Sequence, residues 1–303
     1  MLKTVELKVG KTKLAWGSRT YVMGILNITP DSFSGDGLLA GKEQPDYVQL
    51  ALEQARRFVA AGADILDVGG ESTRPGSQPV TLEQELERVL PVVRALVAEL
   101  EVLVSIDTYK AQVAEAALEA GAQMVNDVWG LRADPNLAAV VGRFKVPVIL
   151  MHNRSSWVHA EVKERLGGRY IGMEYQNLLE DVKRELLESV ALARAGGVPD
   201  KRIILDPGIG FGKTVEQNLE LIDRLGEIRE LGYPILLGPS RKSFIGYTLD
   251  LPPEQRLEGT AAALAVGIDR GVDIARVHDV TAMVRVARMT DAIVRRTGKK
   301  APG

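Results

Sequence analysis

The sequence predicts a (β/α)8 TIM barrel with an N-terminal β-hairpin. Eight short apolar, β-branched runs occur along the 303 residues, and stretches with helical spacing of apolar residues separate them. Each run also ends in a polar residue that a buried strand does not require. Eight strand and helix units in unbroken alternation favour a closed barrel over the open, doubly wound sheet that uses the same units.

The expected strands are mostly continuous Val, Ile and Leu runs, as parallel strands buried on both faces require. They span residues 20–29, 63–70, 102–108, 123–128, 146–152, 202–208, 233–240 and 274–280. The clearest helices between them are expected at 48–61, 81–100 and 174–195. Thr81 with the acidic residues after it predicts a helix start, and Gly62, Gly121 and Gly232 predict helix ends.

One barrel domain is expected over residues 20–297. Residues 1–19 alternate apolar and charged side chains, which predicts a hairpin extension and lacks the apolar core of a signal peptide. The tail, 298–303, is expected to be disordered. No run approaches the ~18 apolar residues of a membrane helix, so no membrane partner is expected.

Composition excludes several classes of protein. The formal net charge is −2 and the basic residues are dispersed, which argues against a nucleic-acid partner. Without cysteine the chain has no disulfide, thiol nucleophile or Cys-ligated zinc site, and a cytoplasmic location is expected. Small-molecule substrates are therefore the expected partners.

The polar strand ends predict where the chemistry lies. They begin at Asn27, Asp67, Asp107, Asn126, His152, Asp206, Ser240 and Arg276. In a barrel the carboxyl ends of all strands converge on one face, which is where barrel enzymes carry their active sites. Two long connections, 30–45 and 69–79, follow strand ends and are expected to act as lids, with Phe33 available to cover a ligand.

Carboxylates and an amide at these ends predict a site for a flat, nitrogen-rich heterocycle. Asp107 and Asp206 follow the third and sixth strands, and Asn126 adds an amide. Buried carboxylates in this arrangement could also stabilise a developing cation. Met151 is more often a core residue, although a Met at a strand end can pack against a flat ring.

Basic residues after strands seven and eight predict an anion site, with diphosphate as the natural ligand. Lys242 lies in "GPSRKSFIG", and alternation places Arg276 and His278 on one face of the eighth strand. Arg offers a bidentate fork and Lys a point charge. Arg74 could close over the same anion, and one of Arg241 and Arg276 is expected in a salt bridge to a strand-end carboxylate.

Two weaker signals are set aside. "DPGIGFGKT" has Pro207 where a phosphate-binding loop needs its first glycine. His152 and His159 lack zinc-motif spacing, and three histidines in the chain exclude a His-rich metal site. Asn27 with a phosphate oxygen and waters would suit magnesium, which usually keeps several waters.

The motifs together resemble the dihydropteroate synthase family, the sulfonamide target of folate biosynthesis. The resemblance is carried by "GILNITPDSFSGDG", "GADILDVGGESTRPGS", "SIDT", "NDV", "LMH", "LDPGIGFGK", "GPSRKSFIG" and "RVHDV", in the family's order. It implies a transferase that condenses (7,8-dihydropterin-6-yl)methyl diphosphate with 4-aminobenzoate and releases diphosphate. It also implies a dissociative mechanism, a magnesium cofactor and a homodimer.

The resemblance assigns roles residue by residue. Those implied to bind the pterin are Asp107, Asn126, Met151, Asp206, Lys242 and Arg276. Those implied to bind diphosphate are Asn27, Thr73, Arg74, Arg276 and His278. Those implied to frame 4-aminobenzoate are Phe33, Thr73, Pro75 and Ser240. Asp107, Lys242 and Arg276 are implied to be catalytic, and Asn27 to bind the metal.

Two alternatives stay open at this point. A pterin-dependent methyltransferase domain shares the barrel and the strand-end carboxylates, but should lack the "STRPG" loop and the "SRK" cluster that are present here. A non-catalytic pterin-binding paralogue is favoured only by Asp36, which stands one position later than is usual in the family. Whether Asp36 reaches the metal is left open, because glycine on both sides gives the backbone freedom.

Overall fold

The computed structural model describes residues 6–29, 47–72, 79–155, 160–163, 165–170 and 174–295. Its centre is an eight-stranded parallel sheet in the order β10, β7, β6, β5, β4, β3, β12, β11. A parallel bridge between Leu205 and Ile235 joins the two outer strands and closes the barrel. The expected fold class, a (β/α)8 barrel, is confirmed.

All eight expected strands are present, and most are shorter than expected. They are β3 (Tyr21–Asn27), β4 (Ile65–Gly69), β5 (Leu103–Asp107), β6 (Met124–Asp127), β7 (Val148–Met151), β10 (Ile203–Asp206), β11 (Leu236–Leu237) and β12 (Ile274–Val277). The largest difference is β11, expected over 233–240. Pro234 and Pro239 flank it, and proline has no N–H to donate to a strand ladder.

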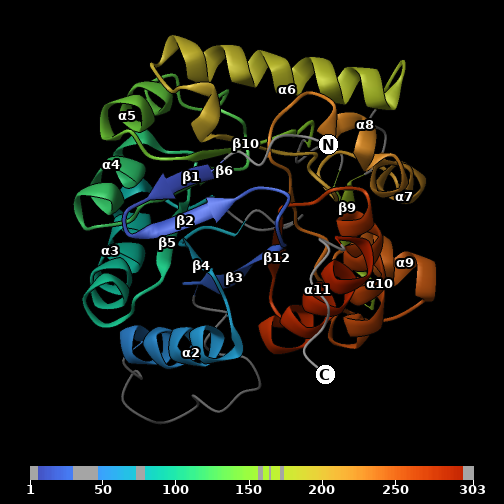
Figure 1. Cartoon of the computed structure of the whole chain (residues 1–303), viewed down its shortest axis with the longest axis horizontal. Coiled ribbons are helices and arrows are strands. Elements are labelled where there is room, and N and C mark those ends of the chain that lie inside the picture. The colour runs from blue at the N-terminus through green and yellow to red at the C-terminus, as the bar shows by residue number, and fades with distance from the viewer. Residues whose placement is uncertain are drawn as a thin grey trace.

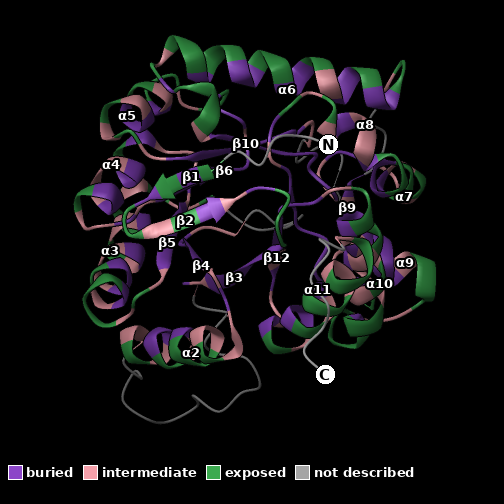
Figure 2. Ribbon diagram, in the orientation of Figure 1, coloured by how far each residue is buried: buried purple, intermediate pink, exposed green. Residues whose placement is uncertain are grey.

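Helices surround the barrel (Figure 1). They are α2 (Tyr47–Ala61), α3 (Leu82–Glu99), α4 (Ala111–Glu119), α5 (Leu137–Phe144), α6 (Leu178–Ala195), α7 (Val215–Asp223), α8 (Leu225–Arg229), α9 (Ser243–Leu249), α10 (Leu257–Asp269) and α11 (Val280–Val294). Short 3-10 turns cover Asp200–Arg202 and Pro253–Gln255. Their buried faces turn toward the sheet and their exposed faces outward (Figure 2).

The expected helix signals lie where they were predicted. The Thr81 side chain accepts from the Gln84 N–H, and the Gln84 side chain accepts from the Thr81 N–H, which forms a capping box at the start of α3. Gly62, Gly121 and Gly232 have φ values of 102°, 106° and 89° after their helices. Glycine adopts this left-handed backbone without the strain that a Cβ would add.

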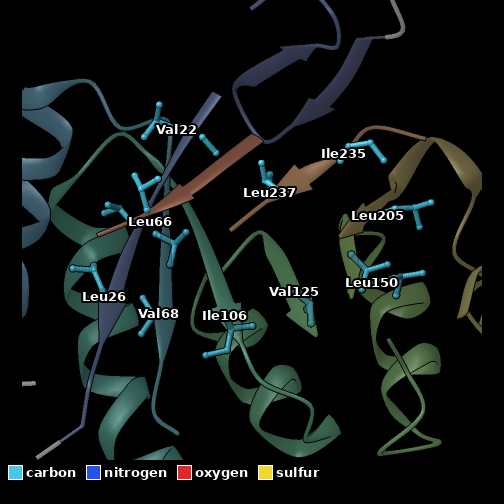
Figure 3. Close-up of a cluster of buried hydrophobic side chains, with 14 of the residues drawn as sticks. Val22, Leu26, Leu66, Val68, Ile106, Val125, Leu150, Leu205, Ile235 and Leu237 are labelled. Carbon is cyan, nitrogen blue, oxygen red and sulfur yellow. The ribbon is translucent and has the colours of Figure 1, made fainter. Parts of the chain in front are cut away.

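Alternation along the strands builds two different interiors. Outward-facing residues such as Val22, Leu66, Ile106 and Leu205 pack beneath the helices (Figure 3). Inward-facing residues at the amino end of the strands form a second apolar cluster, which includes Ile65, Leu103, Met124, Ile149, Ile204, Leu236 and Ile274. The barrel interior is therefore packed at this end.

The expected N-terminal hairpin covers that apolar end. β1 (Glu6–Val9) pairs antiparallel with β2 (Thr12–Ala15), and the hairpin lies across the middle of the helix ring in Figure 1. Its buried side chains belong to the same interior cluster, and they are Leu7, Val9, Leu14 and Trp16. The hairpin therefore plugs the amino end of the barrel and leaves the carboxyl ends of the strands for chemistry.

A second hairpin was not predicted. β8 (Ala160–Lys163) pairs antiparallel with β9 (Gly167–Tyr170) between β7 and α6. Val162 in β8 is 61% exposed, so the hairpin buries no alternating apolar face that the sequence pattern could reveal.

Candidate active site

The inward-facing residues nearest the carboxyl ends of the strands form a polar layer above the apolar one. Its members are Asp67, Ser105, Asn126, Asp206 and Arg276. Each follows, two residues later on its strand, an inward-facing apolar residue. The same period-two alternation therefore fills the barrel at one end and lines a site at the other.

Arg276 joins two strands across this layer. Its Nε lies 2.6 Å from Asp67 Oδ2 and its Nη2 lies 2.6 Å from Asp107 Oδ2. The Asn126 amide donates to the same Asp67 oxygen at 2.9 Å. Asp67 is fully buried, and its Oδ1 has no hydrogen-bond partner within the described residues. One guanidinium thus offsets two carboxylates.

The electrostatics of this group are set by desolvation. Burial raises the pKa of the Asp107 carboxyl, and the charge of Arg276 only partly opposes the shift. The pKa of Arg276 is raised because the two carboxylates outweigh its own burial. The guanidinium therefore stays charged, while the Asp107 carboxyl, with its pKa raised to about 7, would ionise more readily beside a further positive partner.

Asp206 and Lys242 form the opposite side of the layer. Asp206 Oδ1 accepts from the Gly208 N–H at 2.7 Å, and burial raises the pKa of its carboxyl against the charge of Lys242. The Lys242 ammonium donates to the Ile209 carbonyl and lies 4.6 Å from the Phe211 ring centroid. Burial lowers the pKa of Lys242 to about 8.

The other predicted residues of strands seven and eight also meet. His278 Nδ1 lies 3.0 Å from Ser240 Oγ, and Ser240 is buried. Of the two arginines, one was expected in a salt bridge to a strand-end carboxylate. Both are paired: Arg241 binds Asp279 and Arg276 binds Asp67 and Asp107. Arg241 is exposed at the rim of the barrel. The carboxylate of Asp279, two residues after the end of β12, offsets the charge of Arg241.

Asn27 ends β3 with its Cα in register with Gly69 of β4. Met151 ends β7 with its Cα in register with Asp206, and it is buried, as a core residue would be. Five predicted residues lie outside the described residues: Phe33, Asp36, Thr73, Arg74 and Pro75.

Sequence reasoning did not assign Asp67, Lys213 and His152 to the site. Asp67 was recognised as a strand end, and its spacing of two from Ile65 was the signal that it faces inward. His152 is also a polar strand end in the sequence, but its spacing to His159 points to no zinc site, and Lys213 stands in a segment that lacks the first glycine of a phosphate loop. Lys213 Nζ in fact lies 3.0 Å from His152 Nδ1, inside the protein.

Cavities among the described residues lie both at this site and away from it. A cavity of about 550 Å³ lies at the amino end of β7 and β10, lined by Lys145, Arg194, Asp200 and Lys201 among others. Lys145 caps the carboxyl end of α5 and Arg194 lies in the last turn of α6, where positive charge offsets the helix dipole. A smaller cavity lies at the carboxyl end, lined by Tyr109, Trp129, Tyr170 and Phe211 among others. The convergent charged groups, not cavity size, locate the site.

Comparison with known proteins agrees with this geometry. The pterin binding enzyme family matches residues 23–278. A dihydropteroate synthase of Clostridium beijerinckii is 49% identical over 291 residues, which cover 96% of this chain and 100% of that protein. The chain belongs to the dihydropteroate synthase family. Its function is therefore that of a transferase in folate biosynthesis, as the sequence predicted.

Solved dihydropteroate synthases share the fold. The Clostridium difficile enzyme, crystallised in the presence of pteroic acid, has a TM-score of 0.82 at 49% identity over 93% of this chain and 99% of that one. The Xanthomonas albilineans enzyme, solved with 4-aminobenzoic acid, has a TM-score of 0.84 at 38% identity over 96% of this chain and 98% of that one.

Proposed function

We propose that this dihydropteroate synthase joins a dihydropterin-methyl group to the amine of 4-aminobenzoate by a dissociative mechanism. The observation that carries this proposal is the charge balance of the buried layer. Asp67 and Asp107 are buried carboxyl groups that share the single guanidinium of Arg276, so this side of the layer is short of positive charge in a low-dielectric site. Such a site stabilises positive charge that develops on the substrate.

In the proposed reaction the bond between the pterin methylene and the diphosphate oxygen breaks first. The bond's electron pair leaves with diphosphate, and the pterin-methyl cation forms beside Asp107. The raised pKa of Asp107 reports a carboxylate that lacks a sufficient positive partner, so it binds the cation more strongly than the neutral substrate. The arylamine nitrogen then attacks the methylene and loses a proton, which gives 7,8-dihydropteroate.

The pterin ring would lie over the polar layer. Asp107, Asn126 and Asp206 offer carboxylate and amide groups to its ring nitrogens and amino group, and Lys242 offers an ammonium to its carbonyl oxygen. Met151 and Arg276 would pack against the ring. For Arg276 this requires rotation away from at least one of its two carboxylates.

The leaving diphosphate would bind at Arg276, His278 and Asn27, with Thr73 and Arg74 from the second long loop. Phe33, Thr73, Pro75 and Ser240 would frame 4-aminobenzoate. The distance of 3.0 Å between Ser240 and His278 supports neighbouring subsites for the two ligands.

Asn27 fits a magnesium ion only as a minor ligand. Within the described residues no group of three or more acidic or histidine side chains could hold a metal. Asn27 supplies one neutral oxygen, so the ion would depend on substrate oxygens and water. When bound, magnesium would neutralise charge on the departing diphosphate.

We also propose a homodimer and a cytoplasmic location. Exposed apolar side chains on neighbouring helices support the dimer: Leu219 on α7, Val266 on α10, and Met289 and Ile293 on α11. No helix in the described residues has the length and apolar character needed to cross a bilayer.

A diphosphate-release assay tests the reaction. With the pterin diphosphate and 4-aminobenzoate, diphosphate and dihydropteroate should appear in equal amounts. A methyltransferase domain or a non-catalytic paralogue would release no diphosphate under these conditions, and that result would overturn the proposal.

The metal proposal has its own test. Asn27→Ala should raise the magnesium concentration required for half-maximal activity by about tenfold, since the ion would lose a direct ligand. An unchanged magnesium titration would remove Asn27 from the metal site. Asp36→Ala in the same titration decides whether that residue also reaches the ion.

A further inference from the structure

Lys213 is a buried lysine that the proposed mechanism does not use. It closes the segment "DPGIGFGK" after β10, and only 3% of the residue is exposed. Its Nζ lies 3.0 Å from His152 Nδ1, 2.9 Å from the Gly208 carbonyl and 3.0 Å from the Phe211 carbonyl. An ammonium has three N–H groups, so all three are engaged. None is left for a phosphate or a substrate.

His152 links this ammonium to an acidic group behind it. The His152 ring is buried, and its Nε2 lies 3.0 Å from Glu185 Oε2. Burial, and then the charge of Lys213, lower the pKa of His152 to about 3, so the ring is neutral. A neutral ring that accepts from Lys213 at Nδ1 carries its proton on Nε2 and donates it to Glu185. Hydrogen bonds from His152 and Arg154 outweigh burial and lower the pKa of Glu185.

Lys213 is held by these contacts in a place that is unfavourable for a charge. Burial lowers its pKa to about 7, against the opposing effect of the Asp206 charge. Three acceptors around one ammonium favour its charged form. The group therefore acts as a fixed three-point clamp on His152, Gly208 and Phe211.

The clamped loop holds two residues of the proposed pterin site. The Gly208 N–H donates to Asp206, while the Ile209 carbonyl accepts from Lys242. The Phe211 ring lies beneath the same ammonium. The loop backbone therefore orients the Asp206 and Lys242 side chains. Lys213 in turn holds that backbone at the Gly208 and Phe211 carbonyls.

We infer that Lys213 is a positioning residue of the synthase reaction, which acts with His152 to hold the 207–212 loop so that Asp206 and Lys242 meet the pterin ring. The inference rests on the proposed pterin-binding roles of those two residues. In this inference the lysine of "DPGIGFGK" holds the loop in its conformation and does not bind a phosphate.

The inference predicts a selective defect. Loss of Lys213 leaves two loop carbonyls without their donor, so the supports of Asp206 and Lys242 relax. Arg276 and His278 stand on or directly after β12, where Arg276 binds Asp67 and Asp107 and His278 meets Ser240, so these hydrogen bonds go to other elements than the loop. Pterin binding should weaken while diphosphate binding is kept.

Calorimetry with two separate probes tests this. Lys213→Met should weaken the binding of 6-hydroxymethylpterin at least tenfold and change the binding of inorganic diphosphate with magnesium by less than twofold. Lys183→Met is the control, because Lys183 pairs with Glu180 and Glu227 on the outer helices, and it should leave both affinities unchanged. Equal weakening for both probes, or unchanged pterin binding, would overturn the inference.

A second pair of variants keeps the test valid if Lys213→Met does not fold. His152→Asn retains an oxygen near the position of Nδ1, so Lys213 keeps its acceptor. His152→Gln places its polar end near Nε2 and leaves Lys213 without one. Pterin binding should therefore be weaker in His152→Gln than in His152→Asn, and the reverse order would contradict the clamp. Failure of the wild-type protein to bind pterin would instead reject the proposed function.

Discussion

Single residues at the barrel mouth have ionisation states set by burial. Asp107 is the clearest case, because its carboxyl is desolvated and shares one guanidinium with Asp67. Lys242 is the matching cation, with its pKa lowered to about 8 by burial. A ligand that moves these charged side chains apart, or that brings a further charge, therefore changes the protonation of several of them together.

Lys242 should produce an alkaline limit to activity. Its pKa is shifted downward, so the ammonium that donates to the pterin is lost above about pH 8 rather than above pH 10. Asp107, with its pKa raised to about 7, takes up a proton at lower pH, so we expect kcat/KM for the pterin substrate to fall below about pH 7. Above pH 8, kcat/KM should fall about tenfold per unit as Lys242 loses its proton. Lys242→Arg should remove this limb, because a guanidinium stays charged throughout, although its maximal rate should be lower.

The comparison of the two profiles between pH 6 and 10 decides the assignment. If the limb persists at the same pH in Lys242→Arg, another group controls it. Lys213, with a pKa lowered to about 7, is then the group to examine.

The site residues visible to sequence reasoning were those with an unusual polar type at a strand end. Asp107, Asn126, Asp206 and Arg276 meet that condition, and the structure brings them together at the carboxyl ends of the strands. Lys213 does not, because its partners are two backbone carbonyls and a histidine 61 positions away. Contacts of that kind depend on the path of a loop, which residue type and period do not encode.

At the scale of elements, the loop after β10 depends on its glycines. Gly208 has a φ of 71°, and a Cβ there would lie 1.8 Å from the His152 carbonyl oxygen. Gly232, which ends α8, has a φ of 89° but nothing within 4 Å of its Cβ position. An alanine at Gly232 would therefore cause backbone strain alone, whereas an alanine at Gly208 would cause both backbone strain and steric overlap.

Gly208→Ala should be much more harmful than Gly232→Ala. Both variants incur the strain of a side chain in the left-handed region, about 1 kcal/mol. Only Gly208→Ala must also push the loop off β7, which we expect to raise the loss to at least about 3 kcal/mol and to abolish turnover. Urea denaturation measures both, and equal losses in the two variants would contradict the packing of this loop.

Elements with a buried face were predictable, and those without one were not. Continuous apolar runs mark β3 to β7 and helical spacing marks α3, because burial selects those patterns. The β8–β9 hairpin contacts α9 and the segment after it through single side chains. Arg169 lies 4.2 Å from the Tyr247 ring centroid, and the buried Arg256 donates to the Leu166 carbonyl. Neither contact leaves a periodic signal.

At the scale of the whole molecule, the two ends of the barrel have different tasks. The hairpin adds Leu14 and Trp16 to the interior cluster at the amino end and seals it. The carboxyl end keeps the charged layer, where a packed apolar floor lowers the local dielectric constant. The amino ends of the strands therefore contribute to stability, and the carboxyl ends of the same strands carry the reactive groups.

The outer helices α10 and α11 would form the interface of the proposed homodimer. Met289 and Ile293 are 64% and 51% exposed, lie one helical turn apart on α11 and point away from the core. α11 packs against α10, where Val266 is also exposed. Exposed apolar side chains on two helices that pack together gain when a second surface covers them.

Met289→Glu combined with Ile293→Glu should convert the proposed dimer to a monomer. Two carboxylates buried without partners would weaken association by at least about 3 kcal/mol, or about 100-fold in Kd, while the exposed positions leave the fold intact. Sedimentation equilibrium at micromolar concentration measures the change, with circular dichroism as the check on folding. Leu187→Glu is the matched control, since Leu187 is a similarly exposed apolar residue on α6, far from α11 in Figure 1. A monomeric wild-type protein, or a double variant that still dimerises, would show that this face is not the interface.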